Sequence, residues 1–200
     1  MKKTTQEVKR GNIKELLDKT LQSQAIKLRP LDITVGESLK SDFTKVNLAF
    51  SETIGGVNRC IEPNPIQSRG LVDGIFKACY KTFSDRYSSL SNLELYDYKV
   101  KPDFSKRPGD FGADIGVEVG IMVHVKNHGI AEFNNYSRSL VHSSFFATLE
   151  MFEFYINCQK TFDKLQVVLQ NAQARNRADI EQQCISNLCT LTSVNNYEKQ

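Results

Sequence analysis

Three histidines are the residues of this chain best suited to metal binding and acid–base catalysis, so their spacing is considered first. His124 and His128 lie four residues apart. A zinc-protease helix uses this spacing together with a carboxylate, but the alternating pattern of 113–125 and Gly129 place both histidines at a turn between strands. We interpret them as solvent-facing hairpin residues, and His142 as a surface or pocket histidine.

Nucleophilic and phosphate-binding motifs are also missing from the sequence. No serine occupies a GxSxG elbow, no cysteine has an evident histidine partner, and the chain contains neither a P-loop nor a GxGxxG motif. We therefore predict no catalytic residue, no metal ligand and no cofactor, and we expect that the chain alone is not an enzyme.

Two candidate helix starts offer a different chemistry. They are RGLVDG at 69–74 and SRSLVHSS at 137–144, and each follows a predicted strand. The first N–H groups of a helix have no partner within it and attract carboxylates. With apolar side chains beside them, two such starts suit a small apolar amino acid or keto acid. Plain capping of the two helices also explains these residues, and the residues alone favour it.

The helix that contains the second start organises the chain. After the strand pattern of 113–125, the period changes and one helix face over 137–157 becomes apolar. Its stripe consists of Val141, Phe145, Leu149, Phe152 and Ile156. Phe146, Met151 and Phe154 are apolar but lie off this stripe. We expect them to be buried against a second chain, as in a homodimer, or within the domain itself.

An internal repeat suggests how the helices are positioned. Residues 70–83 align with 139–152 without a gap, and 26–35 align with 93–102. In both first strands the apolar residues change parity at the corresponding place, which predicts a β-bulge in each. We therefore predict two units of the same order, at 26–88 and 93–157.

The expected fold class is α+β, with two pseudo-symmetric βββα units whose antiparallel sheet packs on helices. Residues 1–25 are predicted to be a polar tail and a short helix capped by Asn12. The main body of the domain is expected over 26–170, with helix continuing to about 170. Residues 171–200 are expected to form a C-terminal helix near 177–191 and a tail. Prolines within 57–66 predict an edge or irregular strand there.

Composition narrows the function classes. A formal charge of +3 argues against a dedicated nucleic-acid-binding protein. No apolar stretch is long enough to span a membrane, so we expect no membrane partner. The five cysteines form no CxxC motif, and this usage suits a reducing cytoplasm.

The ordered motifs resemble the C-terminal regulatory domain of 2-isopropylmalate synthase and of citramalate synthase. The family pattern GxGPVDAxxxA is similar to SRGLVDGIFKA at 68–78, where Gly70, Val72, Asp73 and Ala78 match. The pattern LxDYxV corresponds to 93–100, and a strand containing Asp-Ala in the family corresponds to 112–123. The pattern DIVxASxxA corresponds to SLVHSSFFA at 139–147, and the closing asparagine of the family to Asn157.

This resemblance covers about 26–170 and implies a function. It implies a dimer whose regulatory domains bind a feedback inhibitor, leucine or isoleucine, in branched-chain amino acid biosynthesis. The catalytic part of that family is a separate (β/α)8 barrel with a divalent metal, for which this chain is too short. We therefore expect a stand-alone regulatory domain, a subunit acting with a separate synthase, or a fragment.

The expected effector is a branched-chain amino acid or its keto acid. Its predicted site consists of residues from the two helix starts: Gly70, Leu71, Val72, Asp73, Gly74, Ser139, Leu140, Val141, Ser143 and Ser144. Asp73 is the only carboxylate in either motif and is expected to accept the ammonium group. Ser68, Leu71, Gly74 and Ser139 differ from the family pattern, which leaves the effector's identity open.

Two other functions stay open on the sequence alone. The first is a small α+β RNA-binding module, which would need aromatic and basic residues alternating on one strand face. The alternate residues of 116–124 that form the more polar face of this strand do not provide such a surface for stacking bases. The second is a regulatory remnant that acts only as an oligomerisation partner of a separate synthase.

Overall fold

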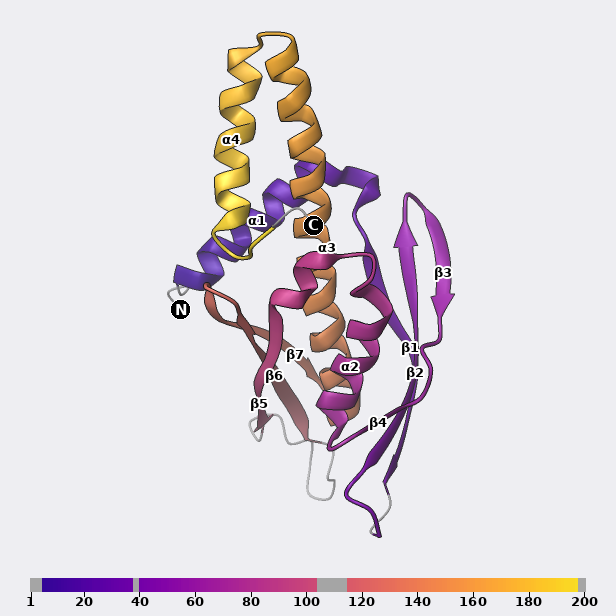
Figure 1. The fold of residues 1–200 in the computed structure, drawn as a ribbon. Helices are drawn as coiled ribbons and strands as arrows, with labels where there is room; N and C mark the ends of the chain where they lie inside the picture. Colours follow the sequence, from indigo (N-terminus) through magenta and orange to yellow (C-terminus); the bar gives the residue numbers. More distant parts are fainter. Residues whose placement is uncertain (1–4, 38–39, 104–114, 198–200) are drawn as a thin grey trace.

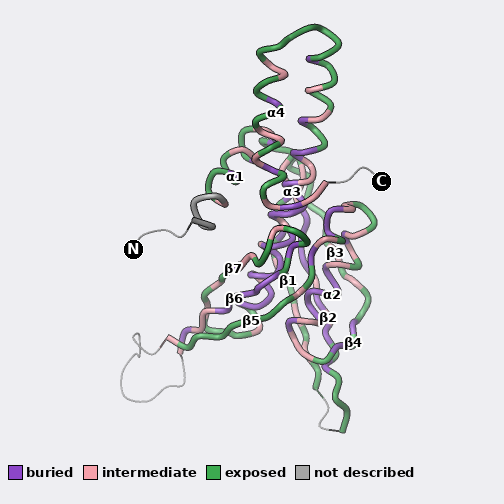
Figure 2. Tube along the Cα trace, turned by 60° about the vertical axis from the view of Figure 1, so that its left-hand side comes forward, coloured by how far each residue is buried: buried purple, intermediate pink, exposed green. Residues whose placement is uncertain are grey.

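The fold places two helices between two antiparallel sheets (Figure 1). The computed structural model describes residues 5–37, 40–103 and 115–197, and of 5–9 it describes the backbone alone. Figure 2 shows the sheets diverging on either side of the helices, with a helical hairpin at the opposite end. The predicted α+β class is confirmed.

The first unit forms a four-stranded sheet. Its strands are β1 (Lys27–Glu37), β2 (Thr44–Ile54), β3 (Val57–Ile61) and β4 (Ile66–Ser68), and helix α2 (Leu71–Phe83) follows. The central strand β2 pairs with β1 on one side and with β3 and β4 on the other. The irregular third strand was predicted, and it divides into β3 and β4 where Pro63 and Pro65 supply no N–H group.

The second unit repeats this order. A short 3-10 turn, η2 (Ser88–Asn92), leads to β5 (Leu93–Asp103), β6 (Gly116–Val125), β7 (Gly129–Ser137) and α3 (Leu140–Ala174). The central strand β6 pairs with β5 and β7. The predicted turn before β7 is confirmed, and Gly129 has a φ of 83°, which suits glycine. The start of the 112–123 match, at 112–114, lies outside the described residues.

Both first strands contain the predicted β-bulge. The register shifts between Pro30 and Asp32 in β1, and between Leu95 and Asp97 in β5. The extra residues are therefore Leu31 and Tyr96. The second bulge lies two residues earlier than the sequence alignment places it. Both first strands therefore contain a bulge, but not at corresponding positions of the alignment.

Each helix packs on the sheet of its own unit and also on the first strand of the other unit. Helix α2 packs on β2 and β4 of its own sheet and on β5 of the other, whereas α3 packs on β6, β7 and β1. Phe50 of β2 lies 5.7 Å from Phe83 and 6.4 Å from Phe145, between ring centroids. Phe152 lies 5.3 Å from Phe76 by the same measure. This shared aromatic core joins the two units into one domain.

Two sequence predictions need correction. The N-terminal helix α1 (Thr5–Leu21) begins about two turns before Asn12, so Asn12 is not its cap. Met151 and Phe154 are buried within the chain, so of the two predicted alternatives burial within the domain is confirmed for them and the dimer interface is wrong. The Phe154 ring lies 5.8 Å from Phe133 of β7, and α1 covers the same side of α3.

A helical hairpin completes the fold. Helix α3 runs for 35 residues and turns back into α4 (Ala178–Thr192), close to the predicted range of 177–191. The chain then returns to the body, where Tyr197 stacks on Phe162 with ring centroids 4.6 Å apart. None of the helices in the described part of the chain has the length and hydropathy needed to cross a bilayer.

Candidate functional site

The start of α2 has no side-chain cap. Its N-cap is Gly70, and the first internal bond runs from Gly74 N to Gly70 O at 3.0 Å. Val72 and Gly74 are buried, whereas Leu71 and Asp73 are half-buried. The early N–H groups of α2 therefore receive no side-chain oxygen from the cap residue, which leaves them to water or to a ligand.

Gly74 is explained by close packing. A Cβ at this position would lie 2.6 Å from Val46 Cγ2 and 2.7 Å from Ser68 Oγ. Helix α2 therefore approaches β2 and β4 more closely than a side chain at position 74 would permit. This accounts for one departure from the family pattern, in which alanine occupies the corresponding place.

The start of α3 is capped by Ser139, and its other serines have partners within the chain. Ser139 is the N-cap, as predicted, and its Oγ accepts from His142 N at 3.3 Å. The buried hydroxyl of Ser143 lies 2.8 Å from Ser137 Oγ, and Ser144 Oγ donates to Leu140 O at 2.7 Å. These contacts fit the capping interpretation of the second helix start, since its serines already have partners within the chain.

Two hollows lie at the seams between the units, each between the helix of one unit and the first strand of the other. The α2–β5 hollow encloses about 320 Å³ and is lined by Asp73, Phe76, Lys77, Tyr80, Lys81, Leu93, Glu94 and Leu95. The α3–β1 hollow encloses about 310 Å³. Both volumes are at the lower end of the range for small-molecule sites.

The α2–β5 hollow combines an apolar surface with charges of both signs. Phe76, Tyr80 and Leu95 supply the apolar part. Asp73 Oδ2 accepts from Lys77 Nζ at 2.7 Å in an i,i+4 pair whose side chains are both partly exposed. Of the ten predicted effector residues, Asp73 alone lines either hollow, so neither hollow contains both helix starts.

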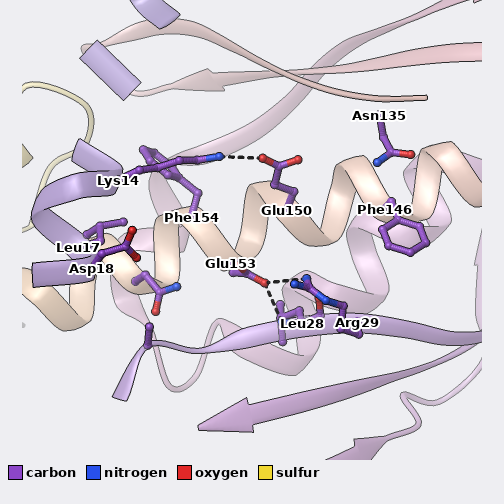
Figure 3. A pocket seen from close by; sticks show the side chains of 12 residues that line it. Lys14, Leu17, Asp18, Leu28, Arg29, Asn135, Phe146, Glu150, Glu153 and Phe154 are labelled. Carbon is purple, nitrogen blue, oxygen red and sulfur yellow. Dashed lines mark hydrogen bonds and ion pairs between the residues drawn. The ribbon is translucent and has the colours of Figure 1, made fainter. Parts of the chain in front are cut away.

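The α3–β1 hollow is closed on one side by α1 (Figure 3). Its lining residues are Lys14, Leu17, Asp18, Ala25, Leu28, Arg29, Asn135, Phe146, Glu150, Glu153, Phe154 and Asn157. Lys14 Nζ lies 3.0 Å from Glu150 Oε1, and Arg29 Nη1 lies 3.7 Å from Glu153 Oε2. In this hollow, cations and anions of the chain are paired with each other.

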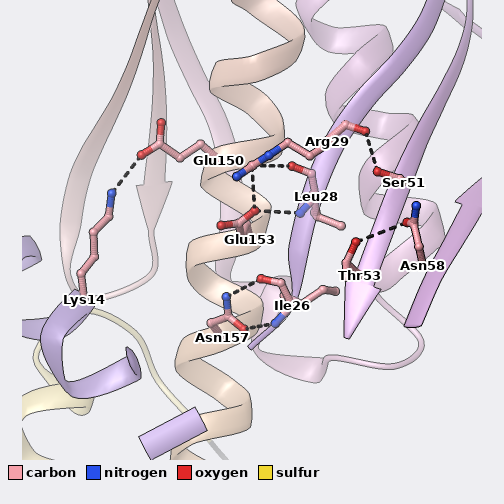
Figure 4. A network of polar contacts seen from close by, with 10 residues as sticks. All are labelled: Lys14, Ile26, Leu28, Arg29, Ser51, Thr53, Asn58, Glu150, Glu153 and Asn157. Carbon is pink, nitrogen blue, oxygen red and sulfur yellow. Dashed lines mark hydrogen bonds and ion pairs between the residues drawn. The ribbon is translucent and has the colours of Figure 1, made fainter. Parts of the chain in front are cut away.

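Glu153 and Asn157 attach β1 to α3 (Figure 4). Glu153 Oε2 accepts from Leu28 N at 2.7 Å, while Asn157 bonds Ile26. Burial raises the pKa of the Glu153 carboxyl, against the Leu28 N–H group and the Arg29 guanidinium, which lower it. Sequence reasoning missed this role of Glu153, although an acid on a mostly apolar helix was a usable signal.

The histidines do not form a metal site. His124 Nδ1 is 4.0 Å from Glu94 Oε2, and His128 Nε2 is 3.0 Å from Asn196 Oδ1. The exposed His142 ring lies against Phe146, with centroids 4.4 Å apart. Across the described ranges, His, Cys, Asp and Glu form no group of three that could hold a metal ion.

Comparison with known proteins adds no family to this picture. No protein-family model matches the sequence, and no curated protein matches it significantly.

Proposed function

We propose that this chain is a regulatory module that binds a branched-chain amino acid, or its keto acid, in the α2–β5 hollow. The proposal rests on the resemblance to the regulatory domain of 2-isopropylmalate synthase. The repeated units and the bulge in each first strand are consistent with that resemblance. A fold alone does not define a function, so the site has to carry the argument.

The observation that carries the proposal is the position of Asp73. This residue belongs to the motif on which the resemblance rests, and it lines an apolar hollow large enough for a small ligand. The uncapped start of α2 lies within the same turn of helix. Motif, charge and cavity therefore coincide at one place, whereas the α3 start is already capped by Ser139, whose Oγ accepts from His142 N.

The lining residues match the parts of a zwitterionic apolar amino acid. Asp73 and Glu94 can accept from an ammonium group, and Lys77 and Lys81 can pair with a carboxylate. The branched side chain would lie on Phe76 and Leu95. The existing Asp73–Lys77 pair does not prevent this, because a partly exposed i,i+4 pair contributes only about 0.3–0.5 kcal/mol.

The other hollow shows how the chain fills the equivalent seam by itself. In the α3–β1 hollow, Lys14 and Arg29 neutralise Glu150 and Glu153, and α1 covers one side. The α2–β5 hollow has no such helix among its lining residues. We therefore assign the effector to the α2–β5 hollow.

In this proposal the chain regulates and pairs but does not catalyse. It would form a homodimer or bind a separate synthase subunit that supplies the barrel and the metal. The purified chain should then show no condensation of acetyl-CoA with a 2-keto acid. A cytoplasmic location is part of the proposal, and the five cysteines, all free, support it.

Thermal-shift scans with leucine, isoleucine, valine and their keto acids test the proposal. A ligand at a hundred times its dissociation constant should add about 2.7 kcal/mol of stability, or roughly 5–10 °C in Tm for a chain of this size. Asp73→Asn should reduce the shift with amino acids more than with keto acids, because only the former carry an ammonium group.

The matched control is Glu153→Gln, which makes the same chemical change in the α3–β1 hollow. It should leave the shifts unchanged. If Glu153→Gln abolishes the shift and Asp73→Asn does not, the effector binds in the other hollow. If millimolar concentrations of all six compounds leave Tm unmoved, the effector proposal is wrong.

A further inference from the structure

The helical hairpin has an unusual lack of charge. Residues 165–174 of α3 contain no Asp, Glu, Lys or Arg, and neither do residues 182–197 in and after α4. At the 24% charged content of the whole chain, two stretches of this total length would carry about six charged side chains. Charged residues stand beside these stretches at Lys164, and between them at Arg175, Arg177, Asp179 and Glu181 around the turn of the hairpin.

This uncharged surface is exposed. Figure 1 shows the hairpin extending beyond the sheets, and Figure 2 shows that most of its outer part is exposed. Val167, Val168 and Ile185 are 58%, 37% and 45% exposed. The other exposed side chains are mainly amides and hydroxyls. An exposed helix face normally carries charged residues, so their absence here requires an explanation.

Little packing supports the outer half of the hairpin. Beyond the body, α3 and α4 pack mainly on each other, and the buried contacts there include the small residues Ala172 and Cys184. Helices of this kind gain most of their stability from burying an apolar face. A further pair of helices packed on one side of the hairpin would bury the exposed apolar side chain of that side, Val168 or Ile185, and would complete a four-helix bundle.

We propose that the uncharged part of the hairpin, residues 165–174 of α3 and 182–192 of α4, is a self-association surface that docks the same part of a second copy of this chain. In an isologous interface the same patch faces itself across a twofold axis, so any charge near the axis would face its own like charge. A surface without charge avoids this penalty. A partner recognised by opposite charge would instead require charges on the patch.

This inference rests on the pairing part of the proposed function and names its surface, but it does not depend on the effector. The cores of protein interfaces are depleted in charged residues, as the hairpin is. The predicted interface of Met151 and Phe154 is thus replaced by one that lies further along the same helix and on α4.

The test is the mass of the full chain in solution. Sedimentation equilibrium from about 1 to 100 µM should show a dimer of about 45 kDa, twice the 22.7 kDa of the chain. Ile185→Lys and Val168→Lys, which lie on different sides of the hairpin by helical spacing, each place a like charge on both copies. At least one should weaken the dimer tenfold or more and thereby identify the contacting face.

The matched control is Val57→Lys, the same change at a residue of β3 that is 61% exposed and belongs to neither helix of the hairpin. It should leave the dimer intact. Circular dichroism should show unchanged helix in all three variants, since all three positions are exposed. A monomer at 100 µM overturns the inference, and so does a dimer that neither hairpin variant weakens.

These outcomes separate the inference from the proposed function. A dimer insensitive to both hairpin variants would still allow pairing through another surface. The leucine thermal shift, measured on the monomeric hairpin variant, should persist if effector binding needs one copy alone. Its loss in that variant would show that the effector site depends on the dimer, while still locating the dimer contact at the hairpin.

Discussion

Asn157 bonds both backbone groups of Ile26, although 131 residues separate them. Its Oδ1 accepts from Ile26 N at 2.8 Å, and its Nδ2 donates to Ile26 O at 2.9 Å. Glu153, one turn earlier in α3, accepts from Leu28 N. The distance from Glu153 to Asn157 along the helix matches the distance from Leu28 to Ile26 along the strand, because four helical residues rise about 6 Å and two strand residues rise about 7 Å.

Because Asn157 makes both hydrogen bonds, we predict that Asn157→Leu destabilises the protein. The substitution keeps the number and branching of the side-chain heavy atoms but leaves the buried N–H and C=O groups of Ile26 without their partner, at about 1–3 kcal/mol for each such group. We expect a loss of about 2–4 kcal/mol in urea unfolding, with an unchanged m-value. Asn58→Leu is the control, because its bond to Thr53 is exposed and should matter little. A loss equal to that of the control would contradict the anchoring role.

Gly74 provides a second stability prediction. Alanine at this position would bring Cβ to 2.6 Å from Val46 Cγ2, so Gly74→Ala should cost about 1–3 kcal/mol by overpacking. The cost should fall in a Val46→Ala background, measured as a double-mutant cycle. Gly11→Ala is the control, since no atom lies within 4 Å of its added Cβ and alanine favours the helix interior. If Gly74→Ala costs the same free energy in the native and the Val46→Ala backgrounds, the helix accommodates the added Cβ by shifting, without a clash with Val46.

Much of the fold could be predicted because its signals are local. The alternating apolar residues of 115–125, the three- and four-residue steps of 141–156 and the parity switch at each first strand all depend on neighbours in the chain. The start of α1 could not be predicted in this way. Residues 5–11 lack an apolar stripe of their own, so the helix there is not visible as a pattern.

The candidate site was harder to predict because it depends on distant segments. Asp73 was found through its motif, but the hollow beside it requires β5, the first strand of the other unit. The packing of each helix on the first strand of the other unit leaves no pattern in the sequence. The interpretation of Phe154 as an interface residue failed for the same reason: α1 and β7 cover it, and only tertiary packing brings them there.

Glu153 should make stability depend on pH. Burial raises its pKa in the folded protein above the unfolded value of 4.5, so the folded state binds the proton more tightly. Its contribution is fully present below about pH 4.5 and is lost as the pH rises through the raised pKa. The difference in unfolding free energy between the native chain and Glu153→Gln should therefore decrease over this interval. A difference that increases with pH would show that Arg29 and Leu28 N–H outweigh burial.

The last prediction concerns a buried carboxylate beside the C-terminal end of α2. Only 3% of the Glu52 side chain is exposed, and Arg86 reaches it with Nη2 at 3.0 Å and Nη1 at 3.5 Å. Removing one partner of a buried pair leaves an uncompensated charge at a cost of about 3–5 kcal/mol. Because Arg86 is itself 42% exposed, water can replace part of the lost interaction. We therefore expect Arg86→Met to cost about 2–3 kcal/mol.

A charge-neutral double variant separates this electrostatic cost from packing. Glu52→Gln combined with Arg86→Met should recover most of the loss, because no buried charge then remains unpaired. Lys14→Met is the control: it breaks the exposed pair with Glu150 and should cost only about 0–1 kcal/mol. Urea unfolding of the three variants and the native chain at pH 7 would measure these differences. If the double variant is no more stable than Arg86→Met, the arginine acts through the contact of its guanidinium with the Phe83 ring, whose centroid lies 5.2 Å from Cζ.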